Sequence, residues 1–451
     1  MKKNITTNIL KPLILLGMLL TGLFFTACED DEVSSGPIGI SAVYLQDVNS
    51  TVQDRLVTFA RLGQLLRIEG FGFTGLSKIY INGFETFFNT VYVSDNSLLV
   101  RISGDTPTVD AEEADRNTIR FVKGDSEITY SFEIRASAPT ITNISTTLPN
   151  AGEEITVSGT GLLEVSKVIF PGNIEVTDGI TFDEEDGEFF TVTVPSGIPD
   201  SGGPLLVETA NGRVYSPSYF NVRRGLILNF DGTGTLGEFG NTVRQDELQS
   251  MPIGQGNVSQ GNYVYHGPAE GETFGAGANR NSEVFTGGNE SWRTAYTSLI
   301  PVTTPVDSVA FQFDVFVPEP WEGTGFLQIL LINNFNGGEF TGGVYNYIPW
   351  IVEGEIEAFE TTGWTTVTVP LSEFYAFSDG EFTFEDVLQL REGATFKNFG
   401  FFFNNSDVPL SSVNGSNSET VFPASATSIA VYTDNWRIVP LSVPPLSDFP
   451  E

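Results

Sequence analysis

The sequence predicts an all-β protein made of two small β-sandwiches followed by a larger one. Three observations support this prediction: short apolar segments of alternating polarity, frequent Gly and Pro between them, and no convincing amphipathic helix. The chain has 451 residues with 47 Gly and 24 Pro, and its hydrophobic content of 40% is enough to fill several cores. At about 100–200 residues per domain, two to four domains are expected.

The chain is strongly acidic, with 22 Lys and Arg against 57 Asp and Glu and a formal net charge of −35. This charge repels phosphate backbones, which argues against nucleic acid as a partner, and it also disfavours sulfated or uronic-acid polymers. A neutral ligand fits best. One cysteine excludes an intramolecular disulfide, and one histidine, His266, excludes most histidine-based metal sites.

The first 28 residues form the sharpest signal in the chain. Three lysines precede an apolar run from Leu13 to Phe25 that is too short to span a bilayer, and two further residues lead to Cys28. We predict a lipoprotein signal peptide over residues 1–27. The arrangement resembles a bacterial lipobox, in which the cysteine is acylated and becomes the mature N-terminus, although Phe25 stands where an aliphatic residue is usual. The alternative is an ordinary signal peptide that a chance cysteine follows.

An acidic linker over residues 28–37 follows the signal peptide, and its acidic run is Glu29-Asp30-Asp31-Glu32. The run resembles the signal that sends some lipoproteins of Gram-negative bacteria to the outer face of the outer membrane. The alternative is a solvated linker without a sorting role. The resemblance implies a lipid-anchored protein of the outer membrane that faces the outside.

The middle of the chain contains an internal repeat. Residues 63–73 match residues 152–162, and residues 76–83 match residues 165–172, with one offset of 89 residues throughout. In each copy an alternating strand leads into a Gly-x-Gly pair, and a second apolar strand then ends in a turn dipeptide. Units of about 90–100 residues built from short strands predict immunoglobulin-like sandwiches.

These repeated residues resemble the IPT/TIG family of immunoglobulin-like domains. The second copy, assigned to residues 137–222, fits best because it opens with Ala138-Pro139. The first copy, assigned to residues 38–136, carries an acidic insert around residues 109–115. The resemblance implies that both domains act as spacers, and the alternative is that one of them binds ligand.

The character of the chain changes near Gly225, where Gly- and Asn-rich loops begin to separate apolar strands. Only Phe384 to Leu390 suggests a helix, of one or two turns. About 220 all-β residues in one unit, assigned to 225–443, predict a jelly-roll-like β-sandwich. The expected strands are residues 226–230, 308–317, 326–332, 365–369, 397–403 and 429–439.

Three segments of this last domain resemble carbohydrate-binding β-sandwich modules: residues 228–232 (LNFDG), 363–372 (GWTTVTVPLS) and 431–438 (VYTDNWRI). Together with the lipobox and the IPT/TIG pair, they resemble a surface glycan-binding lipoprotein of polysaccharide-utilisation systems, with a C-terminal domain of the xyloglucan-binding type. The resemblance implies non-catalytic capture of a neutral polysaccharide, either xyloglucan or another β-glucan or hemicellulose. It also implies that the protein acts beside a TonB-dependent transporter and separate hydrolases.

Flat aromatic rings are the expected platforms for sugar faces, because pyranose rings have apolar C–H faces and polar rims. Trp364 and Trp436 occupy strand positions and are expected in the core. If residues 344–351 form one straight strand, Tyr345 and Tyr347 face one way and Trp350 the other. The candidate glycan-binding residues are Trp292, Trp321, Tyr345, Tyr347 and Trp350.

Polar residues complete the candidate site. Amide and carboxylate side chains can reach sugar hydroxyls, and the candidates are Asn333, Asn334, Asn336 and Glu353. Asp231 and Asp434 open and close the last domain and are the candidate ligands of a structural calcium ion, and no other cofactor is expected.

Two rival functions remain open. A glycoside hydrolase would use two carboxylates, but 57 acids make such pairs easy to find, and the alternating Glu353, Glu355 and Glu357 are typical of a solvated face. His266 has no accompanying nucleophile motif such as Gly-x-Ser-x-Gly. We therefore predict that the protein is not an enzyme. A surface adhesin that binds protein partners is the other alternative, because immunoglobulin-like spacers suit it equally well.

Overall fold

The computed structural model describes most of the chain after residue 35. Cys28 and three predicted hydroxyl partners, Asn333, Asn334 and Asn336, lie outside the described residues. The chain divides into two compact units, one through Ser137 and one from Ala138 onward. The described residues are 36–124, 126–216, 219–237, 249–250, 262–287, 291–331, 343–378, 380–414 and 418–446.

The first unit is a β-sandwich whose two four-stranded sheets run β2-β1-β4-β7 and β6-β5-β8-β9. The short strands β3 and β10 pair in parallel beside them. The elements are β1 (Gly39–Gln46), β2 (Asp54–Leu56), β3 (Phe59–Arg61), β4 (Leu65–Phe71), β5 (Lys78–Ile81), β6 (Phe84–Thr86), η1 (Thr90–Tyr92), β7 (Ser97–Arg101), β8 (Thr118–Lys123), β9 (Ser126–Ser131) and β10 (Glu133–Arg135). Alternating residues such as Leu66 and Ile68 are fully buried between the sheets, as the sequence pattern predicts.

The second unit begins with residues 138–222, which we call the second sandwich. Its two sheets run β11-β12-β16-β15 and β14-β13-β17-β18. The strands are β11 (Thr140–Ile144), β12 (Glu154–Thr160), β13 (Lys167–Phe170), β14 (Ile174–Val176), β15 (Ile180–Phe182), β16 (Phe189–Thr193), β17 (Leu206–Thr209) and β18 (Gly212–Tyr215). Its repeat residues Ile155 and Val157 are buried like Leu66 and Ile68 of the first unit.

The two glycines of each Gly-x-Gly pair are required for different structural reasons. A Cβ atom at Gly70 would lie 1.9 Å from the carbonyl oxygen of Gly39, and one at Gly159 would lie 1.8 Å from that of Thr140. The first glycine is therefore required by the close approach of a neighbouring strand. The second glycine provides the positive φ, at 79° for Gly72 and 66° for Gly161.

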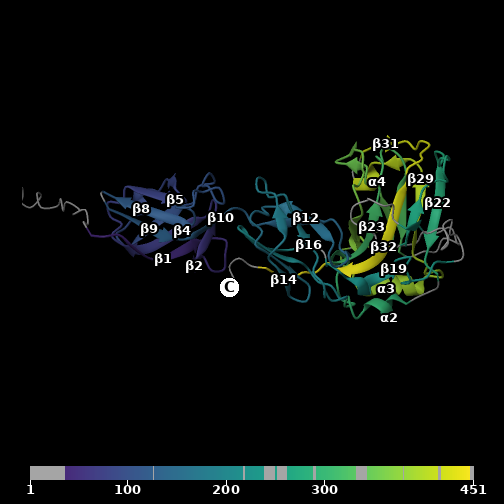
Figure 1. The fold of residues 1–451 in the computed structure, drawn as a ribbon, viewed down its shortest axis with the longest axis horizontal. Coiled ribbons are helices and arrows are strands. Elements are labelled where there is room, and N and C mark those ends of the chain that lie inside the picture. Colours follow the sequence, from purple (N-terminus) through teal and green to yellow (C-terminus); the bar gives the residue numbers. More distant parts are fainter. Residues whose placement is uncertain are drawn as a thin grey trace, which may run out of the picture. The chain divides into compact units, whose positions relative to one another are not determined.

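Residues 223–446, the third sandwich, hold two facing sheets (Figure 1). One runs β20-β21-β32-β23-β28, with β19 also paired to β32, and the other runs β22-β29-β24-β25. Every strand expected from the sequence is present, with shifted ends. The strands of these sheets are β19 (Leu226–Leu228), β20 (Gln249–Ser250), β21 (Asn262–His266), β22 (Ala278–Phe285), β23 (Val309–Phe316), β24 (Phe326–Leu330), β25 (Val344–Tyr347), β28 (Thr365–Pro370), β29 (Gly400–Asn405) and β32 (Val431–Pro440).

Short elements close the two ends of the third sandwich. Figure 1 shows α2 (Trp292–Tyr296) and α3 (Phe384–Gly393) at one end, and α4 (Ser411–Asn414) and β31 (Val421–Phe422) at the other. In the part of the chain that the structure describes, no helix has the length and apolar character needed to cross a membrane. The remaining elements are η2 (Arg223–Gly225), η4 (Val306–Ser308), β26 (Ile351–Val352), β27 (Glu355–Ile356), η6 (Leu371–Glu373) and β30 (Val408–Pro409).

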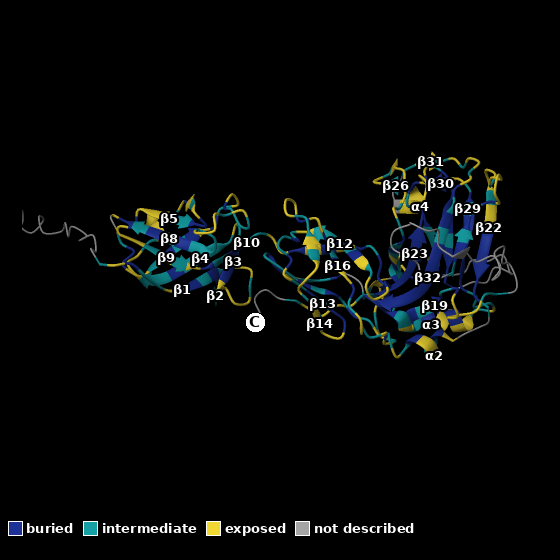
Figure 2. Cartoon of the chain, in the orientation of Figure 1, coloured by how far each residue is buried: buried dark blue, intermediate teal, exposed yellow. Residues whose placement is uncertain are grey.

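The core of the third sandwich lies between its two sheets and is rich in aromatic rings. All eight residues of β23 are buried, and Figure 2 shows β23 and β32 as its buried centre. The rings of Phe401 and Trp436 lie 4.2 Å apart between their centroids, and those of Phe311 and Phe399 lie 5.1 Å apart. Such ring pairs stabilise the core beyond the area that they bury.

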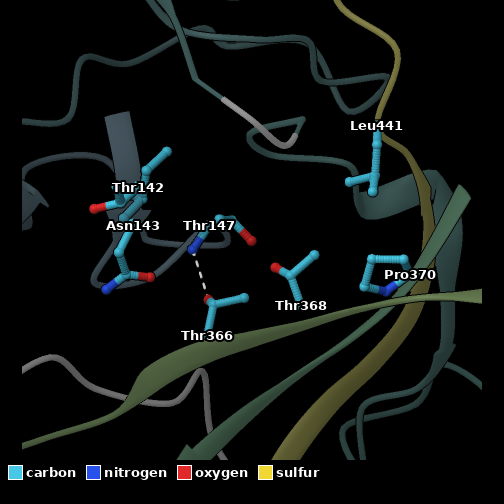
Figure 3. Close-up of a pocket in the computed structure, with 8 residues that line it drawn as sticks. Thr142, Asn143, Thr147, Thr366, Thr368, Pro370 and Leu441 are labelled. Atoms are coloured by element: carbon cyan, nitrogen blue, oxygen red, sulfur yellow. Dashed lines mark hydrogen bonds between the residues drawn. The ribbon is translucent and has the colours of Figure 1, made fainter. Parts of the chain in front are cut away.

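Hydrogen bonds join the second and third sandwiches within the second unit (Figure 3). The Thr147 backbone N–H donates to the Thr366 hydroxyl at 2.9 Å, and the Thr366 N–H donates to the Ser145 carbonyl at 3.0 Å. Arg437 on β32 donates from Nη2 to the Thr147 hydroxyl at 2.7 Å. Because Thr147, Thr366 and Arg437 are buried, this junction is shielded from water and fixes the two sandwiches against one another.

Candidate functional site

The structure buries the three tryptophans predicted as sugar platforms. Trp292, Trp321 and Trp350 are 3%, 1% and 0% exposed and belong to the core of the third sandwich. The Nε1–H of Trp321 donates to the Thr324 carbonyl and that of Trp350 to the Gly325 carbonyl, both at 2.8 Å. A ring without exposed surface cannot stack on a ligand, so the prediction that these rings are displayed is wrong.

The two predicted tyrosines lie on one face of β25, as alternation required, but that face points into the core. Tyr347 is 8% exposed, and burial raises the pKa of its hydroxyl. Tyr345 is half-buried with its ring 5.5 Å from that of Phe374, and burial also raises its pKa. The residue between them, Asn346, therefore lies on the outward face of the sheet.

The two tryptophans expected in the core are buried, but in different places. Trp436 is 0% exposed between the two sheets. Trp364, which is 3% exposed, instead belongs to an outward-facing aromatic cluster with Tyr263, Phe316 and Tyr432. In this cluster Tyr432 remains half-buried, and its ring lies 5.8 Å from that of Phe316.

Asp231 and Asp434 lie on neighbouring stretches of chain without sharing a surface. Leu228 of β19 pairs with Trp436 of β32, so the chain after β19 runs beside Asp434. Asp231 is exposed and accepts from the Asn262 backbone N–H, whereas Asp434 is fully buried and accepts from the Asn435 N–H. Within the described ranges, no three His, Cys, Asp or Glu side chains gather into a metal-binding group.

The one histidine has a structural environment. His266 is 0% exposed, with Nδ1 3.3 Å from the Ser282 carbonyl and Nε2 2.9 Å from the Thr433 hydroxyl. Because the Ser282 carbonyl can only accept, Nδ1 carries the proton of a neutral imidazole, and Nε2 accepts from the Thr433 hydroxyl, which itself accepts from Trp436 Nε1 at 3.1 Å. Burial lowers the pKa of His266 to about 4. The ring is therefore neutral near pH 7, is shielded from solvent and serves packing.

The acidic residues near β26 and β27 are solvated, as expected from the sequence. Glu353, Glu355 and Glu357 are all exposed on or beside the β26–β27 hairpin. Glu353 occupies the turn, with φ of 52°. Surface carboxylates of this kind fit a solvated hairpin rather than a sheltered catalytic pair.

The outward face of β22-β29-β24-β25 carries a row of amides that the sequence analysis did not select. Gln328 on β24 stands opposite Asn346 on β25, and its Nε2 donates to the Asn346 Oδ1 at 2.8 Å. On the other side, Gln328 stands opposite Phe402 on β29, and Asn404 follows two residues later on the same face. All three amides are half-buried. We call Gln328, Asn346 and Asn404 the amide face.

The amide face has hydrogen-bonding capacity that the fold does not use. The Oδ1 atom of Asn404 is buried and accepts no hydrogen bond from the residues described. Buried polar atoms are usually satisfied by protein or by ordered water, so we expect a water molecule to be the partner of this atom. Phe285, Leu330 and Phe402 form a small apolar cluster on the same side of the sheet and are buried themselves. The half-buried, uncharged amides complement the hydroxyl groups of a neutral ligand.

The only sequence signal for this face is weak. Gln328 interrupts the apolar segment 326–332, and Asn346 stands between two tyrosines. A single amide within an otherwise apolar strand indicates that one face of the sheet is not entirely core. Without the register of three strands, however, nothing in the sequence places Gln328 beside Asn346.

Comparison with known proteins identifies the third sandwich. Residues 220–440 match the family model described as the surface glycan-binding protein B xyloglucan binding domain. An IPT/TIG domain-containing protein of Bacteroides ovatus is 27% identical over 319 residues, which cover 70% of this chain and 55% of that protein. The chain therefore spans little more than half the length of this relative.

A solved structure of a similar protein shares the fold. The crystal structure of the surface glycan-binding protein PbSGBP-B from Prevotella bryantii matches with a TM-score of 0.64 at 20% identity, covering 90% of this chain and all of that one. The SGBP-B from a complex xyloglucan utilization locus in Bacteroides uniformis matches with a TM-score of 0.47 at 18% identity, over 90% and 100% of the two chains. The first match confirms the all-β fold class. The match of residues 220–440 to this family model confirms that the last domain resembles the xyloglucan-binding type.

Proposed function

We propose that this protein is a non-catalytic surface glycan-binding protein whose third sandwich binds a neutral polysaccharide, either xyloglucan or another β-glucan or hemicellulose. One observation carries the proposal: the domain that matches this family model presents uncharged amides with spare hydrogen-bonding atoms on the outward face of one sheet. The binding contacts come from Gln328 and Asn346 in place of the buried tryptophans.

The chemistry of the amide face suits sugar hydroxyls. The hydrogen bond from Gln328 to Asn346 leaves the Gln328 Oε1 as an acceptor and the Asn346 Nδ2 as a donor for ligand. Each such bond contributes about 0.5–1.5 kcal/mol, and a few of them with apolar contact support roughly micromolar to millimolar binding. A net charge of −35 selects against anionic polymers.

The proposed setting is the outer face of the outer membrane. Acylation of Cys28 would anchor the mature chain, and the acidic run after it would direct export. Reversible capture of polysaccharide at the surface would deliver this substrate to a TonB-dependent transporter beside the protein. The family description and the Bacteroides uniformis relative from a xyloglucan utilization locus support this setting.

No cofactor is required for this function. A structural calcium ion at Asp231 and Asp434 stays a prediction, and a rise in melting temperature on adding calcium that is lost in Asp231→Asn would support it.

Affinity electrophoresis of the chain from residue 36 onward tests the proposal. We expect retardation in gels that contain xyloglucan or mixed-linkage β-glucan, and none in gels that contain a sulfated or uronic-acid polymer. Gln328→Ala and Asn346→Ala should each weaken binding about three- to tenfold, as expected for the loss of one or two hydrogen bonds. Asn49→Ala, which removes an exposed amide of the first unit, is the matched control and should change nothing.

Two outcomes would contradict the proposal. If no neutral glycan retards the unsubstituted chain, glycan capture is wrong and a protein-binding adhesin becomes the better explanation. If incubation with polysaccharide releases reducing ends, the protein is a hydrolase.

A further inference from the structure

Three adjoining hollows run along the outward face of the β11-β12-β16 sheet of the second sandwich. Their volumes are about 300, 480 and 600 Å³. Thr142 borders the first and second hollows, Asn143 borders the first and third, and Thr156 and Ser158 border the second and third. The hollows therefore form one continuous depression, which we call the trough. Its volume is in the range of pockets that hold small molecules.

One wall of the trough comes from the second sandwich and consists of uncharged polar side chains. Asn143, Thr156 and Ser158 line it, and within the described ranges their side chains make no hydrogen bond to another residue. The opposite wall is the segment from Phe359 to Thr365 of the third sandwich. The first wall thus offers hydroxyl and amide groups that the fold leaves available for a ligand.

Aromatic and acidic groups lie at the two ends of the trough. Phe189 on β16 stands opposite Ser158 on β12, and its ring is 44% exposed. At the other end Phe359 is half-buried beside the exposed Glu360. An exposed ring can lie against a sugar face, while hydroxyl, amide and carboxylate groups bind its rim.

A β-bulge directs Asn143 into the trough. The pairing of β11 with β12 shifts register between Ile141 and Asn143, so both Thr142 and Asn143 are exposed. The first unit has the same bulge between Ile40 and Ala42, and there Ala42 stands at the position that Asn143 occupies in the second sandwich. Bulges often re-aim a side chain next to a functional site.

The first unit, which is the other copy of the repeat, shows which residues the fold accepts at the trough positions on β12. At the 89-residue offset, Thr156 corresponds to Arg67 and Ser158 to Glu69. In the first unit Arg67 forms an ion pair with Glu69 and lies 4.3 Å from the centroid of the Tyr44 ring. The fold therefore accepts a charged, internally satisfied face at these positions. The uncharged face of the second sandwich is a property of that copy and not a requirement of the fold.

From these observations we infer that the trough is a second polysaccharide-contact site, which binds an extended segment of the same neutral polymer that the third sandwich binds. This inference rests on the proposed function. The buried junction at Thr147, Thr366 and Arg437 fixes the two walls before ligand arrives, which lowers the entropy cost of binding. Two contacts on one polymer raise the affinity for long chains above that for short oligosaccharides.

The test measures binding of polymeric xyloglucan and of a short xylogluco-oligosaccharide to the same variants of the chain from residue 36 onward. Phe189→Ala should weaken polymer binding about three- to tenfold through loss of stacking and avidity, and leave oligosaccharide binding unchanged. The double variant Thr156→Arg, Ser158→Glu copies the ion pair of the first unit into the trough, so it should fold and show the same selective loss. Phe87→Ala, at an 85% exposed ring of the first unit, is the control and should bind like the unsubstituted chain.

The outcomes separate this inference from the proposed function. If both trough variants bind polymer as tightly as the control while Gln328→Ala does not, the trough is not a glycan site and the proposed function stands. If the unsubstituted chain binds neither polymer nor oligosaccharide, the proposed function fails and this inference with it. If the trough variants weaken polymer and oligosaccharide equally, a separate second contact is excluded.

Discussion

The Nη2 atom of Arg437 lies 2.7 Å from the Oγ1 atom of Thr147, a residue 290 positions earlier in the chain. The same nitrogen lies 3.0 Å from Oδ1 of Asp314, and the side chains of Arg437 and Asp314 are 0% and 3% exposed. One buried guanidinium therefore links the last strand, its neighbour β23 and the second sandwich. The walls of the trough depend on this link.

Arg437→Met should strongly destabilise the second unit, because it leaves the carboxylate of Asp314 buried without its charged partner. Removing one member of a buried ion pair costs about 3–5 kcal/mol. Urea denaturation would measure this loss. Arg224→Met, at an exposed arginine whose Nη2 donates to Ser298, is the control and should stay within about 0.5 kcal/mol of the parent. Equal stability of the two variants would show that the buried link contributes nothing.

Acidification should destabilise the third sandwich through His266. Burial lowers its folded pKa from the ordinary 6.5 to about 4, so the unfolded chain binds more protons between these values. The stabilising contribution is fully present above pH 6.5 and is lost as the pH falls to about 4. Because a shift of one pKa unit corresponds to about 1.36 kcal/mol, the contribution of His266 to the free energy of unfolding is at most about 3 kcal/mol. His266→Gln should flatten the dependence of the urea midpoint on pH in this window, and an unchanged slope would contradict the assignment.

Substitution of the buried tryptophans should affect stability and not glycan affinity. Trp350→Phe removes the hydrogen bond to the Gly325 carbonyl and should cost about 1–3 kcal/mol of unfolding free energy. Its affinity for xyloglucan, measured by calorimetry on folded protein, should equal that of the parent. A loss of affinity without a loss of stability would mean that Trp350 is a sugar platform after all.

Gly70→Ala should destabilise the first unit, because the new Cβ would lie 1.9 Å from the Gly39 carbonyl oxygen. Overpacking of this kind typically costs about 1–3 kcal/mol. Gly104→Ala in the same unit is the matched control, since a Cβ there meets nothing within 4 Å. Thermal melts should separate the two variants by several degrees, and coincident melts would refute the close-approach explanation of the repeated glycine.

Local patterns in the sequence were sufficient for the fold. Alternating residues such as Leu66, Ile68, Ile155 and Val157 predicted buried strands, and the repeated Gly-x-Gly marked equivalent positions of two sandwiches. This works because a strand side chain points to the face that its position in the alternation dictates. The weak helical signal at Phe384 likewise became α3.

The prediction of the site was wrong because the sequence does not show which face of a sheet points into the core. Tyr345 and Tyr347 share a face, as predicted, but aromatic residues are equally suited to a ligand and to a core. Only the packing of β25 against the opposite sheet turns them inward and leaves Asn346 outside. The tryptophans in loops were misplaced for the same reason, since loops can fold back over a core.

The sequence by itself determined that the chain is acidic, all-β, repeated in its first half and related in its last half to a glycan-binding family. These properties follow from composition and from interactions within short segments. Tertiary structure alone decided which side chains of different strands lie together, such as Gln328 with Asn346 and Ser158 with Phe189. Those neighbours come from different strands, and strand register is set by the packing of whole sheets.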